Sequence, residues 1–415
     1  MTQPLKGVRV IDLSHVIAGP MASLYLAQLG AEVIKIEPPA TGEVMRASRA
    51  REDGPERGDT PAGFAALNAG KQSLAVDIRT PEGAQIVRSL ARTADVFIEN
   101  FRPGVVARRG LDYDAIRAEK PDIVYCSISG YGQQGEWAGR GAYDHVVQAL
   151  TGMMMMSGES PDAPPLKVGF PVIDVAVGML GALAITAALR RRDQQGVGEY
   201  IDASMVQAAS MLMYPNASSY LTHGIRPQRV GNRGYTGSPT ADTYQCADGW
   251  LAVAANTPAQ FRRLTCELGL QDLCDDADAL DLDAFRAPGG GFVVARDLPA
   301  LQRRFREAMA QRHAADMELR LNAAGVPAAR VRSLGEFLDD GQQAGVLVPR
   351  TYADGTQQVR TPGLGFRYRD ATAAAASAGA PALGQHSASV LASIGFGVRD
   401  IARLCEVGIV GGSSA

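Results

Sequence analysis

The chain has 415 residues, more than a single hydrophobic core usually supports, so we expect two domains. Hydrophobic residues make up 46% of the sequence and charged residues 20%, a balance that excludes wholesale disorder. The formal net charge of −3 gives no electrostatic reason to expect nucleic acid or an anionic membrane as a partner.

The first half of the chain alternates short apolar strands with helices. Strands are expected at residues 8–13, 32–37, 73–78, 95–99 and 123–129, and helices at 19–29, 81–93 and 114–120. Strand–helix alternation of this kind is typical of a mostly parallel sheet with helices on both faces.

An apolar run from residue 175 to 189 is followed by three arginines. It is about five residues short of the ~20 that cross a bilayer, so we expect a fully buried core helix. Asp174 stands at the start of this run, where aspartate commonly caps a helix. A helix N-terminus also keeps a partly buried carboxylate ionised for attack on an acyl carbon. The residues alone leave both roles open.

The second half changes character. Residues 202–221 are expected to be helical, and the Gly-, Arg- and Pro-rich stretch 224–239 marks a boundary. A smaller α+β segment follows, with a strand at 250–254, helices near 258–268 and 298–311, and a second boundary near 325–327. We expect loops at 288–291 and 371–380, and residues 411–415 outside the fold.

Several familiar kinds of chemistry lack support. The five cysteines are scattered without a Cys-x-x-Cys pair, which suits a reducing cytoplasm and gives no zinc site. The start of the chain has no apolar segment of a secretory signal. Residues 130–135 match Gly-x-Gly-x-x-Gly, but no helix opens directly after them, so a turn or substrate loop is favoured over a dinucleotide site. No Gly-x-Ser-x-Gly elbow occurs, and the five histidines form no group with ligand spacing.

Short motifs follow one another along almost the whole chain, at residues 7–20, 29–37, 68–73, 79–83, 94–104, 129–132, 143–144, 174–202, 383–386 and 391–395. Together they resemble the class III CoA-transferases of the CaiB/BaiF type, a family that includes formyl-CoA and carnitine-CoA transferases. The resemblance weakens between about residues 274 and 304.

The resemblance implies an acyl-CoA:carboxylate CoA-transferase in which Asp174 is the catalytic nucleophile. Asp174 would attack a donor thioester to form an aspartyl anhydride, and the returning thiolate would form an aspartyl-CoA thioester. CoA enters as a substrate thioester, so no permanent cofactor or metal is implied. The partners implied are an acyl-CoA, a small carboxylic acid and a second copy of the chain.

The resemblance also assigns binding roles. Substrate-binding residues are Tyr143, His15 and Ile17, and CoA-binding residues are Ala18, Lys71, Asn100, Phe101, Arg102, Gly104 and Arg108. Some of them have a structural alternative: Asn100 and Gly104 as turn formers, Lys71 and Arg108 as surface charges, and Tyr143 as a core aromatic.

Some positions depart from the family pattern. Ile17 replaces a glutamine of some members, which removes a polar contact to the acyl group. Residues 231–237 replace the glycine run that covers the formyl-CoA transferase site, so formate and oxalate are unsupported as substrates. The methionines 153–156 suggest an adaptable apolar wall and a bulkier acyl group, although core packing is the commoner role of such a run. Arg46 and Arg49 are candidates to bind a second carboxylate.

Two alternatives stay open. The 2-methylacyl-CoA racemases of the same family use a histidine before an aspartate, where this chain has Tyr143-Asp144 followed by His145. A non-catalytic CoA-binding paralogue is the other.

For the fold, the resemblance implies an α/β protein with a Rossmann-like, parallel-sheet large domain at 1–223 and a smaller α+β domain at 224–330. Residues 331–415 would be a linker and a C-terminal return that completes the large domain. It also implies an interlocked homodimer, and the cysteine pattern places the protein in the cytoplasm.

Overall fold

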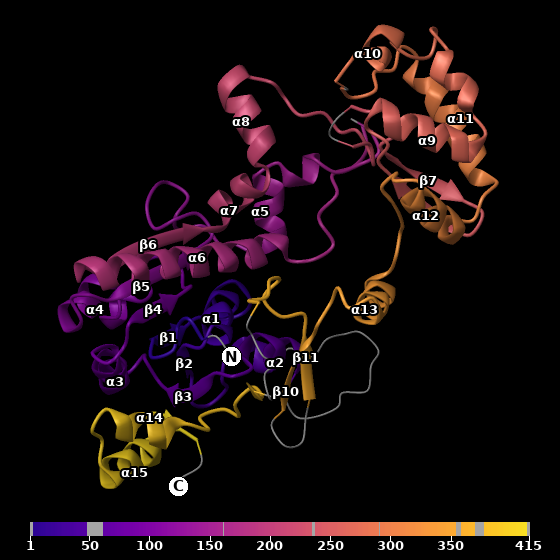
Figure 1. Cartoon of the computed structure of the whole chain (residues 1–415). Helices are drawn as coiled ribbons and strands as arrows, with labels where there is room; N and C mark the ends of the chain where they lie inside the picture. The colour runs from indigo at the N-terminus through magenta and orange to yellow at the C-terminus, as the bar shows by residue number, and fades with distance from the viewer. Residues whose placement is uncertain are drawn as a thin grey trace. The chain divides into compact units, whose positions relative to one another are not determined.

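The computed structural model describes residues 3–47, 61–160, 162–234, 237–289, 291–353, 358–369 and 377–412, which fold into two compact units (Figure 1). The first unit contains residues 1–155, 166–227 and 348–415. The second contains residues 156–165 and 228–347. Each unit has its own hydrophobic core.

A seven-stranded sheet forms the centre of the first unit. Its strands, in spatial order, are β13 (Val410–Gly411), β3 (Gln72–Val76), β2 (Glu32–Glu37), β1 (Arg9–Leu13), β4 (Val96–Glu99), β5 (Val124–Ser129) and β6 (Glu199–Ser204). All neighbours pair in parallel except β13, which is antiparallel to β3. The strand order reverses between β1 and β4, and open α/β sheets bind ligands at such a reversal, beyond the carboxyl ends of the strands.

Helices cover both faces of this sheet, as the strand–helix alternation predicts. On one face, α1 (Ala18–Gln28), α6 (Val172–Gln195), α5 (Asp144–Leu150) and α7 (Met205–Leu212) contribute to one apolar core. On the other, α3 (Pro81–Ala91), α4 (Tyr113–Glu119), α14 (Ser387–Ser393) and α15 (Val398–Glu406) contribute to a second. The mixed α/β fold with a parallel sheet is therefore confirmed.

The long helix α6 differs from the expectation in its burial. By length and composition it could cross a membrane, yet half of its most apolar window is buried inside the protein. Full burial was the wrong expectation, because Leu183 remains 66% and Met179 44% exposed on the side away from the sheet.

The helix expected at 202–221 begins later. Residues Glu199–Ser204 form β6, with Ile201 opposite Cys126 of β5, and the Ser204 side chain caps α7. Pairing with β5 therefore overrides the local helical pattern, and the helical segment is divided into α7 and α8 (Tyr214–His223).

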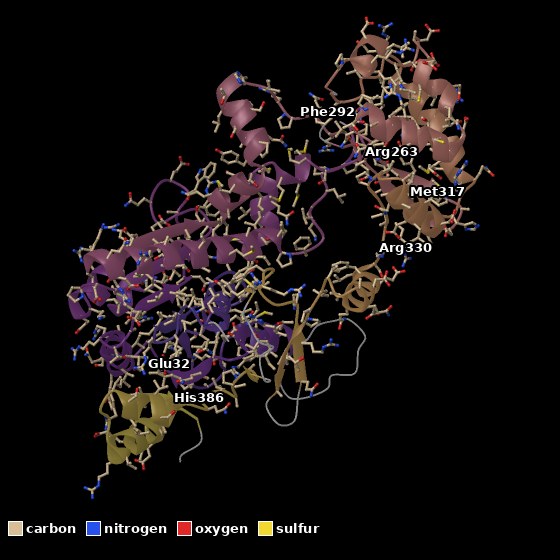
Figure 2. All side chains as sticks on the ribbon, viewed as in Figure 1. Glu32, Arg263, Phe292, Met317, Arg330 and His386 are labelled. Atoms are coloured by element: carbon tan, nitrogen blue, oxygen red, sulfur yellow. The ribbon has the colours of Figure 1, made fainter. Side chains whose placement is uncertain are left out.

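The C-terminal segment returns to the sheet, as the resemblance implied. His386, labelled in Figure 2, accepts a hydrogen bond from the Ser73 N–H through Nδ1, and β13 completes the edge beside β3. The expectation that residue 411 lies outside the fold was wrong, because Gly411 pairs with Ala75; residues 413–415 lie outside the described residues.

A small three-stranded sheet completes the first unit: β10 (Arg350–Ala353), β11 (Gln358–Thr361) and β12 (Ser377–Ala378). The loop expected at 371–380 was wrong at 377–378, which pair with β10, whereas residues 371–376 lie outside the described residues.

The second unit is built around an antiparallel sheet of β7 (Asp242–Cys246), β8 (Gly249–Val253) and β9 (Ala328–Arg330). Its helices are α9 (Pro258–Leu268), α10 (Leu282–Arg286), α11 (Leu298–Ala310), α12 (Ala314–Ala323) and α13 (Leu334–Gln343). Met317, labelled in Figure 2, is fully buried in its core. Residues 235, 236 and 290, which belong to the two glycine-containing loops considered above, lie outside the described residues.

Candidate active site

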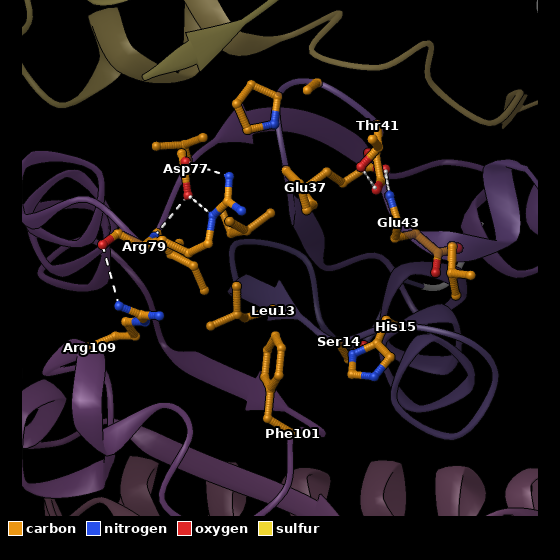
Figure 3. Close-up of a pocket in the computed structure, with 18 of the residues that line it drawn as sticks. Leu13, Ser14, His15, Glu37, Thr41, Glu43, Asp77, Arg79, Phe101 and Arg109 are labelled. Atoms are coloured by element: carbon orange, nitrogen blue, oxygen red, sulfur yellow. Dashed lines mark hydrogen bonds and ion pairs between the residues drawn. The ribbon is translucent and has the colours of Figure 1, made fainter. Parts of the chain in front are cut away.

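A cavity of about 650 Å³ opens in the first unit at the carboxyl ends of β1 to β4, where the strand order reverses (Figure 3). Its lining comes from residues 13–15, 36–44, 76–79, 101, 105, 106 and 109. Most of these side chains are apolar, including Leu13, Ile36 and Phe101. Arg79 and Arg109 lie on one side of the cavity, and Glu43 and His15 lie on the other. The cavity can therefore hold a flat apolar group with anionic groups on the arginine side.

The two arginines are ordered by their neighbours. Arg79 donates two hydrogen bonds to the Asp77 carboxylate, both 2.8 Å long, and Arg109 donates to the Arg79 carbonyl at 3.4 Å. The Arg79 guanidinium lowers the pKa of Asp77 below its usual value, and Arg109 adds to this effect. Sequence reasoning missed both arginines; the available signal was a basic residue just after β3 and another in the loop that follows β4.

Two of the expected binding residues meet at this cavity. The rings of His15 and Phe101 lie 5.0 Å apart, centroid to centroid, and both line it. Asn100 fixes the same turn, because its Oδ1 accepts from the His15 N–H at 2.9 Å and its Nδ2 donates to the His15 carbonyl at 2.8 Å. The Asn100 side chain therefore shapes the turn by binding the backbone of His15, which agrees with the turn-forming alternative.

The turn after β1 leads directly into α1. Ile17 is the N-cap residue of α1, and its side chain makes no capping hydrogen bond. The N–H groups of Ala18 and Gly19 in the first turn have no hydrogen-bond partner among the described residues. A Cβ atom on Gly19 would lie 2.2 Å from the Ser14 Cβ, so only glycine fits there. The first turn of α1 thus offers two oriented backbone donors.

Lys71 is buried, which differs from the expected position along a bound nucleotide. Its ammonium forms an ion pair of 3.0 Å with Asp12 and donates to Ser23, Asn68 and the Pro20 carbonyl. The buried Asp12 carboxylate needs a paired cation, and this holds the lysine inside the protein. The structure therefore favours a structural role for Lys71.

The remaining CoA-binding candidates lie in the loop after β4. Arg102 and Arg108 are exposed and form no ion pair among the described residues, while Gly104 has a positive φ of 81°. Arg102 packs against the backbone at Gly141, where a Cβ would lie 2.9 Å from its Nη2. Neither arginine is among the residues that line the cavity.

Arg46 and Arg49 were the candidates to bind a second carboxylate of the substrate. Arg46 makes two hydrogen bonds to Glu37, of 2.6 and 2.7 Å, and lies over the Phe64 ring. Its guanidinium is therefore already paired. Arg49 lies outside the described residues.

Asp174 is the third residue of α6 and is half-buried. It is not the helix cap: Pro171 occupies that position, and the Asp144 carboxylate caps the helix from α5. No hydrogen bond to the Asp174 carboxylate is formed by the described residues, so its oxygens are available to a substrate. Burial first, and the Asp144 charge second, raise the pKa of Asp174 to about 6.

Packing between α1 and α6 brings Asp174 level with the turn after β1. A Cβ on Gly178 would lie 2.7 Å from the Ala18 carbonyl, and one on Gly181 would lie 3.6 Å from the Ala22 Cβ. The two helices therefore run in the same direction. Because Asp174 precedes Gly178 by about one helical turn, it lies beside the residues that precede Ala18.

Tyr143 is the N-cap residue of α5 and is 69% exposed, so it is not a core aromatic. It stacks on His145, with ring centroids 6.5 Å apart, and directly precedes Asp144.

In the methionine run, Met153 is buried in the core, whereas Met155 is 52% exposed. After the glycine-rich residues 130–135, no helix begins before Asp144, as the sequence indicated.

Comparison with known proteins matches residues 5–387 to the model of CoA-transferase family III. The succinate–glutarate CoA-transferase of Agrobacterium fabrum is 37% identical over 406 residues, which cover 94% of this chain and 96% of that protein. The succinyl-CoA:glutarate CoA-transferase of Mus musculus is 32% identical over 94% of this chain and 86% of its own length.

A solved structure has the same fold. The crystal structure of a CAIB/BAIF family protein from Brucella suis superposes with a TM-score of 0.81 and 31% sequence identity. The match covers 95% of this chain and all of that one.

Proposed function

Because this chain belongs to CoA-transferase family III, and is therefore an enzyme that uses CoA thioesters, we propose that Asp174 carries out the transfer through covalent intermediates. The observation that carries the proposal is the position of Asp174. Its carboxylate has no hydrogen-bond partner among the described residues, and it lies in the first turn of α6, level with the turn that leads to the unpaired N–H groups of α1.

The reaction proceeds in paired steps. An Asp174 oxygen attacks the acyl carbon of the donor, the carbon–sulfur bond breaks, and CoA leaves as a thiolate. The thiolate attacks the aspartyl carbonyl of the anhydride, which releases the donor acid as a carboxylate and leaves an aspartyl-CoA thioester. The acceptor carboxylate attacks that thioester, the carbon–sulfur bond breaks, and CoA thiolate leaves behind an anhydride of Asp174 and the acceptor. The thiolate then attacks the acceptor acyl carbon of this anhydride, which forms the new acyl-CoA and releases the Asp174 carboxylate.

Each attack places negative charge on a carbonyl oxygen. The N–H groups of Ile173 and Asp174 already donate to Asp144, so they are not available to that oxygen. The unpaired N–H groups of Ala18 and Gly19 are the better donors. This assigns Ala18 an oxyanion-binding role, with His15 and Ile17 beside the acyl group.

The cavity is proposed to hold the nucleotide end of CoA. Arg79 and Arg109 would contact phosphate oxygens, with Arg102 and Arg108 available from the neighbouring loop. The apolar lining next to Arg79, which includes Val76 and Ile78, suits the adenine ring.

Short dicarboxylic acids are the proposed acids. The relatives from Agrobacterium fabrum and Mus musculus are named for succinate, or its CoA thioester, and glutarate. We therefore expect succinyl-CoA as donor and glutarate among the acceptors. A homodimer is part of the proposal, since α6 and α8 expose large apolar side chains such as Leu183, Tyr220 and Leu221.

The test is a rate measurement with succinyl-CoA and a series of acceptors from oxalate to adipate, following each product thioester by chromatography. Formation of glutaryl-CoA without ATP supports the proposal. Exchange of an α-proton into deuterated solvent without transfer would establish the racemase alternative, and binding of CoA without either reaction would establish a non-catalytic paralogue.

A further inference from the structure

Val16 has an unusual backbone conformation. Its φ of 65° is the one positive φ at a non-glycine residue in the described part of the chain. Valine is branched at Cβ and rarely adopts this region, because the side chain crowds its own backbone. Such strain persists only where the surroundings enforce it, and it concentrates at functional sites. Val16 lies two residues before α1 and directly after His15, which lines the cavity.

The Glu43 side chain binds the backbone of Val16. Its Oε2 accepts a hydrogen bond of 3.1 Å from the Val16 N–H. Glu43 is only 5% exposed, and within the described residues its other carboxylate oxygen is buried without a hydrogen-bond partner. The carboxylate therefore has one hydrogen-bonded contact in this part of the chain, and that contact is the Val16 amide.

Two further side chains hold the same turn. Lys35 donates from Nζ to the Ser14 carbonyl at 2.9 Å, and Asn100 binds both backbone groups of His15. Three consecutive residues are thus each fixed by a side chain from another segment. The turn they form leads directly to the unpaired N–H groups of Ala18 and Gly19.

We propose that Glu43 is a positioning residue for the transfer reaction: it holds Val16 in the left-handed conformation and so aims the N–H groups of Ala18 and Gly19 at the reacting carbonyl beside Asp174. This inference rests on the proposed function of Asp174. Glu43 acts through the backbone and touches neither substrate nor nucleophile.

The experiment combines two substitutions. Glu43→Ala lets Val16 relax, and kcat for CoA transfer is expected to fall about 10- to 100-fold, because small misplacements of catalytic groups have effects of this size. Val16→Gly in the same protein restores the turn, since glycine adopts positive φ freely, and kcat returns to within about threefold of the Val16→Gly single variant. Glu43→Gln keeps an acceptor for the Val16 N–H and retains most of the rate. Glu32→Ala, which removes a carboxylate at the start of β2, is the matched control.

Two outcomes would overturn the inference. One is a folded Glu43→Ala variant with the wild-type kcat; the other is a loss of rate that Val16→Gly does not reverse, which would assign Glu43 a direct role. If Glu43→Ala does not fold, Glu43→Gln decides, because a large loss of rate with the acceptor retained contradicts positioning. A crystal structure of a Glu43 variant lacking the acceptor tests the turn independently of any activity: φ of Val16 near 65° would contradict the inference even if the wild-type enzyme transfers no CoA.

Discussion

Asp144 and Asp174 share the N-terminus of one helix. The Asp144 Oδ2 accepts hydrogen bonds from the Ile173 N–H at 2.7 Å and from the Asp174 N–H at 3.1 Å. Gln148 donates to the other Asp144 oxygen and accepts from the Val168 N–H, which ties α5 to the segment before α6. Asp144 thus fixes the backbone of Asp174 and places a negative charge beside its carboxylate.

This relationship predicts the pH dependence of the reaction. Only the ionised Asp174 can attack, so kcat/KM should rise with pH through a group whose pKa is about 6. Asp144→Asn keeps a capping oxygen and removes the charge, so the midpoint should move to lower pH by up to about one unit, since burial, the larger cause, remains. The measurement is a pH–rate profile from pH 4.5 to 8, with Asp114→Asn on α4 as the control. A midpoint that does not move would show that the Asp144 charge does not act on Asp174.

Glu99 predicts a pH effect on stability. Burial raises the pKa of Glu99 to about 7, against an ordinary value of 4.5. Between these values the folded state holds a proton that the unfolded chain has released, so stability falls as pH rises, by roughly 3 kcal/mol in total. Glu99→Gln cannot ionise, and should therefore stabilise the protein more at pH 8 than at pH 5. Urea unfolding at both pH values measures this; an equal effect at the two values would contradict it.

Arg109 predicts an effect on substrate binding. If it contacts a phosphate of CoA, Arg109→Met should raise KM for the acyl-CoA about 10-fold or more and leave kcat nearly unchanged. Arg399→Met, which removes an exposed arginine on α15, serves as the control. Steady-state kinetics at two salt concentrations provide the readout. Equal KM values for the two variants would exclude the cavity as the phosphate site.

The close contact between α1 and α6 predicts that an alanine at Gly178 lowers the stability of the fold, whereas an alanine at an open helical glycine raises it. Gly178→Ala should destabilise the fold by about 1–3 kcal/mol, because the added Cβ would lie 2.7 Å from the Ala18 carbonyl. Gly335→Ala in α13 meets no atom within 4 Å and should stabilise by up to about 1 kcal/mol. Thermal unfolding of both variants measures the difference, and a neutral Gly178→Ala would contradict the close packing.

Most strands and helices of the first unit could be predicted from the sequence, because its strands are short apolar runs separated by clear helix signals. The strands at Glu32–Glu37 and Val124–Ser129 lie where hydrophobicity placed them. β6 was missed because its exposed and half-buried residues lack a continuous apolar run, and only pairing with β5 defines it.

Site residues could be predicted only where a local pattern in the sequence, such as the start of a helix, marks them. Asp174 at a helix start could be found, but the helix cap supplied by Asp144 depends on packing between α5 and α6. The burial of Lys71 could not be predicted for a similar reason: its partner Asp12 is 59 residues away, and no local pattern reveals a buried ion pair. Arg79 and Arg109 likewise become neighbours only through the parallel sheet.

The most direct test of the account is the mass of the intact protein after incubation with succinyl-CoA and trapping with hydroxylamine or borohydride, compared with Asp174→Asn. We expect a modification that peptide mapping locates at Asp174 and that is absent from the variant, whose transfer rate should fall by about 1,000-fold or more. An unmodified wild-type protein that still transfers CoA, or a modification on another residue, would contradict covalent catalysis by Asp174.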